Sequence, residues 1–157
     1  MAAWAFKGSR PSADKMQTFY NAGIMGSVWS VEFTDQFEQW WHTLTEDEQD
    51  AVTGAVEILE ERGPGLGRPL VDTIEGSRHA NIKELRAPRG NLRVLFAFDP
   101  RRTAILLIGG DKTNRWDEWY EEMIPVADGL FDAHLIEIEK EKGSDHGEEV
   151  RRTADGS

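Results

Sequence analysis

The chain has no cysteine, and none of its apolar runs approaches the roughly 18 residues that a membrane-spanning helix needs. The missing cysteines exclude a disulfide framework, thiolate chemistry and a zinc–cysteine site. The first residues mix Lys7, Arg10 and Asp14 and contain no apolar core of the signal-peptide type. We therefore expect a cytoplasmic protein that makes no contact with a membrane.

Several common catalytic motifs are also missing. The glycine-rich segment 63–67 follows a predicted helix and contains Pro64, which has no backbone donor, so it does not match a phosphate-binding loop. No Gly-x-Ser-x-Gly segment is present. The four histidines are scattered without the spacing of metal ligands: His42, His79, His134 and His146. We expect neither a metal nor a cofactor.

The charge of the chain is unevenly distributed. The formal net charge of -11 argues against a nucleic-acid partner, because phosphate contacts need Lys and Arg. Residues 63–116, however, contain ten Lys or Arg and only five acids, and the excess acid lies on both sides of them. This asymmetry has two explanations that both stay open: Glu-rich wet faces of helices, or a basic segment that attracts a polyanion.

The first half of the expected domain is a strand followed by two helices. The strand covers 27–33 and has one apolar face, and Thr34 is placed to cap a short helix with an apolar stripe. Thr45 and Glu48 form a capping box for a second helix, which ends at Gly63. Two such helices form a hairpin that can pack on one face of a sheet.

Three further strands are predicted over 82–87, 92–98 and 103–108, joined by short turns into an antiparallel meander. The third of them is apolar at nearly every position, which indicates a central strand covered on both faces. The segment 109–112 is expected to be a loop that places Lys112 at the edge of the sheet.

The pattern after Lys112 is helical, with a short apolar stripe and then a second helix that has Pro125 in its first turn. The chain is therefore an α+β protein of order β-α-α-β-β-β-α. It has a small antiparallel or mixed sheet, a helical hairpin on one face and a C-terminal helix. We assign 27–140 to this domain, 1–26 to an extension of uncertain order, and 141–157 to an acidic disordered tail.

The candidate chemistry rests on a set of cations: Lys83, Arg86, Arg93, Lys112 and Arg115. Arg93 lies within an apolar strand, so its guanidinium must meet solvent, a ligand or an acid such as Glu84. In a shared groove, the arginines would grip phosphate bidentately and the lysines would add point charges. RNA carries its own nucleophile, the 2′-hydroxyl, so a site of this kind can cleave RNA without a metal.

Three short segments follow one another at close spacing, behind the helical hairpin: Lys83–Arg86, Asn91–Phe98 and Leu106–Thr113. In this order they resemble the RelE/ParE superfamily of bacterial type II toxins, nearest its HigB-like, phage-derived branch. The resemblance covers about residues 27–140 and implies a RelE-like fold.

The resemblance implies a toxin–antitoxin system whose toxin enters the ribosome and inhibits translation. The toxin would be an endoribonuclease that cuts mRNA and leaves a cyclic phosphate. A cognate antitoxin, usually a helix-turn-helix protein in this branch, would hold it inactive. By position, Arg93 matches the arginine that contacts the scissile phosphate, and Lys112 and Arg115 match a basic loop. Tyr120, or Trp119 beside it, falls near a tyrosine used for stacking or proton abstraction.

Further RNA contacts are expected from basic residues of the meander and its turns: Lys83, Arg86, Arg89, Arg101 and Arg102. The chain also departs from the family pattern. Glu84 stands where some members carry a catalytic lysine, and Thr113 stands where RelE-type nucleases often carry an arginine. The identity of the general base stays open.

Two other functions fit the same fold. One is a ParE-like inhibitor that binds DNA gyrase and does no chemistry, and the other is an inactive remnant that only binds its partner. ParE-like members tend to lack the basic set, so its presence here favours the nuclease.

Overall fold

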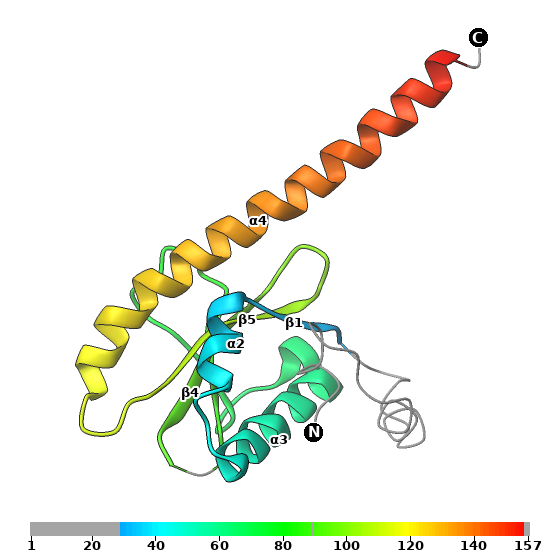
Figure 1. Cartoon of the computed structure of the whole chain (residues 1–157). Coiled ribbons are helices and arrows are strands. Elements are labelled where there is room, and N and C mark those ends of the chain that lie inside the picture. The colour runs from blue at the N-terminus through cyan, green and yellow to red at the C-terminus, as the bar shows by residue number, and fades with distance from the viewer. Residues whose placement is uncertain (1–28, 89, 156–157) are drawn as a thin grey trace, which may run out of the picture.

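A computed structural model describes residues 29–88 and 90–155, with residues 144–155 described by their backbone alone. The predicted extension over 1–26 lies outside the described residues. The elements of the described part follow one another as shown in Figure 1: β1 (Val31–Phe33), α2 (Asp35–Trp41), α3 (Glu46–Arg62), the 3₁₀ turn η3 (Gly63–Gly65), β2 (Val71–Thr73), β3 (Ile82–Arg86), β4 (Leu92–Phe98), β5 (Ala104–Asp111) and α4 (Trp116–Asp155).

The strands form one five-stranded mixed sheet of order β1-β5-β4-β3-β2. β1 pairs with β5 in parallel, and all the other neighbours are antiparallel. The α+β class, the meander and the central position of its third strand are thereby confirmed. β2 was not predicted, because it has only three residues and Val71 alone among them is buried.

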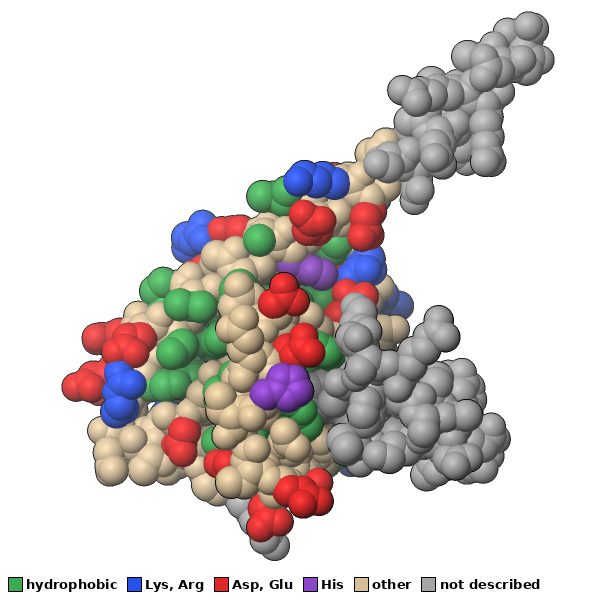
Figure 2. Space-filling view, in the orientation of Figure 1, with side chains coloured by type: hydrophobic (Ala, Val, Ile, Leu, Met, Phe, Trp, Pro, Cys, Tyr) green, Lys and Arg blue, Asp and Glu red, His purple; other side chains and the backbone are tan. Residues whose placement is uncertain are grey.

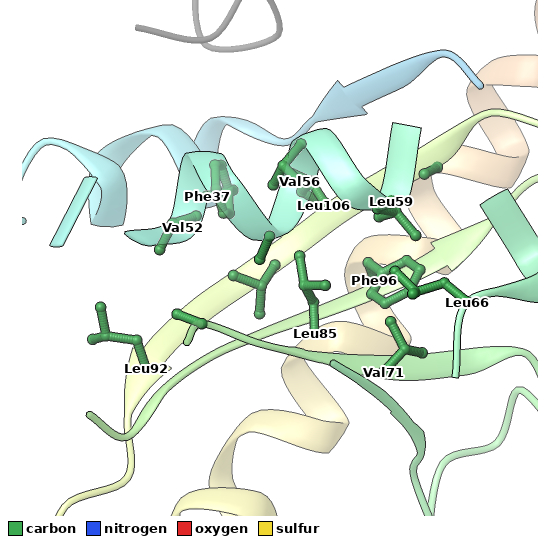
Figure 3. Close-up of a cluster of buried hydrophobic side chains, with 14 of the residues drawn as sticks. Phe37, Val52, Val56, Leu59, Leu66, Val71, Leu85, Leu92, Phe96 and Leu106 are labelled. Carbon is green, nitrogen blue, oxygen red and sulfur yellow. The ribbon is translucent and has the colours of Figure 1, made fainter. Parts of the chain in front are cut away.

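Two apolar cores lie on the two faces of the sheet. On one face, α2 and α3 cover side chains such as Leu85, Phe96 and Leu106, as Figure 3 shows. On the other face, α4 packs Trp119 and Phe131 against the sheet. The alternation of side chains along each strand sends neighbouring residues to opposite cores. The predicted hairpin on one face is confirmed, and α4 adds a third layer.

The predicted helix caps are also confirmed. Thr34 Oγ1 accepts the backbone N–H of Phe37 at 3.0 Å and donates to the carbonyl of Leu107 at 2.6 Å, which ties the start of α2 to β5. Thr45 and Glu48 satisfy each other's backbone donors at the start of α3. The acids of this first turn also favour the helix dipole.

The expected loop at 109–112 is wrong, because β5 continues to Asp111. The two glycines lie inside the strand, and a tryptophan packs against each of them from opposite faces. A Cβ on Gly109 would lie 2.2 Å from the ring of Trp40, and a Cβ on Gly110 would lie 2.3 Å from Nε1 of Trp119. Glycine is needed here for close approach of an indole to the backbone.

The two helices expected after Lys112 are one continuous helix, α4, with Pro125 inside it. Proline removes one hydrogen bond to the preceding turn, but Pro125 and Glu121 are both exposed, so water can satisfy the carbonyl that is left free. The backbone is helical through Asp155, so the boundary predicted at residue 140 does not coincide with a helix end. In the described part of the chain, no helix is both long and apolar enough to cross a membrane.

The middle of α4 is fastened to the sheet by polar contacts. Asp128 accepts the Ser77 hydroxyl at 2.5 Å and the Arg78 backbone N–H at 3.1 Å. One turn later, Asp132 lies 2.7 Å from Nε2 of His79. His134 lies 2.9 Å from the buried carboxylate of Asp99 on the β4–β5 turn. These contacts, together with the apolar core, fix the position of the helix.

The packing at Gly110 predicts a loss of stability on substitution. Gly110→Ala forces its new Cβ into the Trp119 indole, and we expect the free energy of unfolding to fall by about 1 to 3 kcal/mol. The matched control is Gly54→Ala, in the middle of α3 with nothing within 4 Å of its Cβ. This change should stabilise the protein by about 0.5 to 1 kcal/mol. Urea unfolding of both variants measures the contrast, and equal effects would contradict this packing.

A buried acid in α3 predicts a dependence of stability on pH. Burial raises the pKa of Glu60 to about 7, with a smaller contribution from Glu57, and its Oε1 has no hydrogen-bond partner among the described residues. The folded protein therefore holds this proton more tightly than the unfolded chain does. This sign means that the free energy of unfolding falls as the pH rises from 4.5 to about 7.

Glu60→Gln should remove this dependence. We expect the variant to gain up to about 3 kcal/mol over the natural chain as the pH rises through that window, and no further gain above it. Thermal or urea unfolding at several pH values tests the expectation. Glu61→Gln, on the exposed side of the same helix, is the control, and a parallel pH profile for all three proteins would refute the assignment.

Candidate active site

The candidate site lies on the α4 face of the sheet, where β3 and β5 end and β4 begins. Cross-strand pairing sets Arg86 opposite Arg93, and Arg93 opposite Gly110. Glu84 and Arg86 share the face of Ile82, which packs under α4. The first two turns of α4 pass over this corner and bring Trp116, Trp119 and Tyr120 to it.

A buried ion pair forms the centre of the site. Arg93 Nε lies 2.9 Å from Glu84 Oε1, and the two side chains are only 10% and 3% exposed. The Nε–H is not aligned with an acceptor, so the contact is an ion pair and not a directed hydrogen bond. The guanidinium also donates from Nη1 to the carbonyl of Leu92 at 2.9 Å. The acid that Arg93 needs is therefore Glu84, one of the partners considered from the sequence.

Tyr120 and Lys112 extend this pair into a chain of hydrogen bonds. The Tyr120 hydroxyl donates to Glu84 Oε1 at 2.5 Å and accepts from Lys112 Nζ at 3.1 Å. The ammonium of Lys112 lies over the Trp116 ring, 3.9 Å from its centroid, and the residue is only 4% exposed. We call the five residues Glu84, Arg86, Arg93, Lys112 and Tyr120 the Glu84 cluster.

The surroundings shift the proton affinities of two members of the cluster. Burial, the hydrogen bond to Glu84 and the charge of that carboxylate raise the pKa of Tyr120 above its ordinary value, so the phenol stays protonated. Burial lowers the pKa of Lys112, and the charge of Arg93 adds to this effect. Lys112 is therefore a stronger acid than a lysine in water.

Arg86 is at the outer edge of the cluster. Its Nη2 lies 3.2 Å from Asp72 and 3.8 Å from Glu84. A side-chain hydrogen bond from Arg68 is the largest cause that holds the pKa of Asp72 below its usual value. Three cations thus surround Glu84, and Asp72 neutralises only the outermost of them. The cluster therefore has a net positive charge, which attracts an anion.

The other predicted site residues lie elsewhere. Arg115 is exposed just before the start of α4 and pairs with Glu118 and Glu122 of that helix. Lys83 shares the opposite face of β3 with Leu85. Arg89 is outside the described residues. The two arginines of the β4–β5 turn are at the far end of the meander: Arg101 pairs with Asp99 and Glu32, and Arg102 lies over the Trp29 ring.

The expectation of one open basic groove is therefore wrong. Arg93 and Lys112 are buried, Arg86 and Arg93 are paired with acids, and Figure 2 shows Lys and Arg scattered among acidic side chains on the face that it presents. A cavity of about 560 Å³ does lie near this end of the sheet, but on the α3 side. Acids line much of it: Asp47, Glu48, Asp50 and Asp111. The basic surface is closed by the burial of Arg93 and Lys112 and by ion pairs of most of the predicted arginines with nearby carboxylates.

Sequence reasoning gave two residues of the site no functional role. Glu84 was named only as a possible ion-pair partner of Arg93 and as a departure from a family pattern, although a lone acid between Ile82 and Leu85 on a buried strand is itself a signal of a paired charge. Trp116 was assigned to an apolar stripe, and it is instead largely exposed. Its spacing from Tyr120, four residues along a helix, could have placed both rings beside Lys112.

Comparison with known proteins places this architecture in a family. Residues 39–132 match the family model described as "Phage derived protein Gp49-like (DUF891)". The chain belongs to this phage-derived family. The resemblance to its HigB-like branch is confirmed by two proteins of Mycobacterium tuberculosis. Putative toxin HigB3 is 52% identical over 99 residues, which cover 63% of this chain and 87% of HigB3.

The second relative, putative toxin HigB2, is 46% identical over 117 residues, or 73% of this chain. The chain spans only 58% of the length of HigB2. Solved structures with a loose likeness include the RelBE2 toxin–antitoxin complex of M. tuberculosis, with 21% identity, a TM-score of 0.43 and coverage of 54% of this chain and 98% of that one. A mutant of E. coli RelE in the free state has 11% identity, a TM-score of 0.47 and coverage of 60% and 93%.

The buried ion pair predicts strong energetic coupling between its members. Glu84→Leu and Arg93→Met should each lower the free energy of unfolding by about 3 to 5 kcal/mol, because each leaves a buried charge without its partner. The double variant should lose much less than the sum of the two. Urea unfolding of the four proteins measures the coupling.

The control pair is Glu137 and Lys140 on the outer part of α4, whose charged atoms lie 3.8 Å apart and are exposed. Substituting this pair in the same way should give a coupling below about 0.5 kcal/mol. Additive effects at Glu84 and Arg93 would show that the two charges do not depend on each other.

Proposed function

We propose that this chain is the toxin of a type II toxin–antitoxin pair and that it cleaves mRNA on the ribosome at the Glu84 cluster. The first part is supported by the family and by the names of two relatives that are about half identical to it. A cognate antitoxin, which we expect to be a helix-turn-helix protein, is the corresponding partner.

The nuclease proposal rests on one observation, the hydrogen-bonded chain that runs from Lys112 through Tyr120 to Glu84 beside the guanidinium of Arg93. This set contains a carboxylate to accept a proton, a phenol to donate one, and two cations for a developing negative charge. Cleavage of RNA by its own 2′-hydroxyl needs these groups and no other reagent.

The reaction begins with an exchange of partners. A phosphate that enters the site binds Arg93 and Lys112 in place of their present partners, Glu84 and Tyr120. Both cations then neutralise the charge of the transition state. The carboxylate of Glu84 is released from its ion pair at the same moment and can accept a proton. In this proposal, substrate binding releases Glu84 to act as the general base.

The bonds and protons balance within the cluster. Glu84 accepts the proton of the 2′-hydroxyl as the O2′–P bond forms, and the P–O5′ bond breaks. Tyr120 donates its proton to the departing 5′ oxygen, and Lys112 replaces that proton. The products are a cyclic 2′,3′-phosphate and a 5′-hydroxyl. The proton on Glu84 then returns to Lys112 through the Tyr120 hydroxyl, which is bonded to both.

Access to the cluster needs movement of the Tyr120 side chain at the beginning of α4. Tyr120 caps Glu84, and the Trp116 ring covers the ammonium of Lys112. The Tyr120 hydroxyl is held by polar contacts that a phosphate can replace, whereas Trp119, Ala127 and Phe131 anchor the helix itself in the apolar core. The opening is therefore local to the beginning of the helix.

The test is induced expression of the chain with and without its antitoxin, with mapping of 5′ ends in translated and untranslated transcripts. We expect cuts in translated mRNA only. Arg93→Ala and Lys112→Ala should each lower cleavage by about 10²- to 10³-fold, and Tyr120→Phe should lower it by about 10²-fold or more.

Lys83→Ala is the matched control, because Lys83 neighbours Glu84 on the same strand and faces the other core. It should cut like the natural chain. Growth arrest with intact mRNA and altered DNA supercoiling would contradict the nuclease proposal and would identify the chain as a gyrase inhibitor. No arrest at all, with antitoxin binding retained, would identify a remnant that only binds its partner.

A further inference from the structure

Trp116 is the most exposed of the described tryptophans. It is 55% exposed, whereas Trp41 and Trp119 are buried and Trp29 and Trp40 are partly buried. Each exposed tryptophan leaves a large apolar surface in water, which folding alone does not favour. The position at the start of α4, beside the Glu84 cluster, is the one place in the described chain where this surface adjoins buried cations.

The ring is oriented by Lys112. The ammonium lies over the Trp116 ring at 3.9 Å from its centroid, and the same nitrogen donates to Tyr120. One face of the indole is therefore occupied by the cation, and its exposure lies on the other face and the edge. A ring that is fixed on one side and open on the other is a preformed surface for stacking.

We infer that Trp116 is the stacking platform for the nucleobase next to the scissile phosphate. The inference rests on the proposed function and deepens it. A phosphate bound by Arg93 and Lys112 places the adjoining nucleotide beside Trp116, because Lys112 touches both the ring and the cluster. Every base has an aromatic face, so the platform accepts single-stranded RNA and ranks bases by their stacking strength.

The neighbouring charges are compatible with this ligand. Trp116 directly follows Arg115 in the chain, and Arg115 pairs with the nearby acids Glu118 and Glu122. Two of the acids near the platform are thus partly neutralised. Val126 and Ile136, the other large exposed apolar residues of the described chain, lie farther along α4 and are not aromatic. A nucleobase therefore cannot stack on either of these side chains.

The experiment measures cleavage of a defined mRNA on ribosomes by the full chain and three variants. Trp116→Ala should lower the single-turnover rate by about 5- to 150-fold and flatten the base preference beside the cut. Trp116→Phe keeps an aromatic face and should retain most of the rate. Ile136→Ala is the control, because Ile136 is 56% exposed on the same helix and remote from the cluster. It should leave both the rate and the preference unchanged.

A second mRNA with an abasic nucleotide beside the cut separates stacking from a structural role. The natural chain should lose about as much rate on this mRNA as Trp116→Ala loses on the normal one, and Trp116→Ala should lose little more on it. If Trp116→Ala instead slows cleavage of both mRNAs by the same factor, the ring only shields Lys112 and the inference is overturned.

Failure of the platform and failure of the nuclease give different results. If Arg93→Ala abolishes cleavage but Trp116→Ala cuts like Ile136→Ala, the proposed function stands and the platform does not. If the natural chain leaves ribosome-bound mRNA intact, or if Arg93→Ala cuts as well as the natural chain, the proposed function falls and the platform falls with it.

Discussion

The contact on which this corner of the protein depends is the buried ion pair between Glu84 and Arg93. A carboxylate removed from water without compensation costs several kcal/mol, so its neighbours must supply charge and donors. Arg93 supplies the charge, and the Tyr120 hydroxyl supplies a hydrogen bond from α4. The pair therefore fixes both the face on which the cations gather and the place where the last helix begins.

Stability alone is a weak reason for such an arrangement. Buried ion pairs often contribute no more than well-packed apolar side chains of the same volume. The surrounding sheet face is apolar, and Ile82 and Leu95 lie on it beside the pair. Apolar residues at 84 and 93 would continue this core without any cost of desolvation. The charges at these two positions are therefore consistent with the chemical role proposed for the cluster.

The sequence predicted the scaffold of this site well, because the scaffold depends on local rules. The capping box at Thr45 and the alternation along β4 determine their own structure, and both were correct. The failures came from contacts between distant residues. Gly109 and Gly110 are typical of a loop unless the tryptophans that pack on them are known, and Pro125 marks a break unless its turn of helix faces water.

The sequence predicted which residues meet at the candidate site better than it predicted how they are arranged there. Arg93, Lys112 and Tyr120 do meet, but a count of basic residues could not show which of them carboxylates neutralise. Arg101 and Asp99 pair within one turn, and Arg115 pairs with acids at the start of the helix that follows it, so neither arginine reaches the cluster. Pairing of this kind depends on side-chain distances in the folded protein, which composition and spacing along the chain do not contain.

The closed cluster and the acidic surface have a common consequence for RNA. A formal net charge of -11 opposes general binding of polyanions, and the paired cations offer little field at a distance. A phosphate gains from Arg93 and Lys112 only when it is already at the corner and displaces their partners. Free RNA would rarely reach that arrangement, whereas an RNA strand held in position by another assembly would. The electrostatics thus favour a nuclease that acts on presented RNA, in agreement with a site that forms around its substrate.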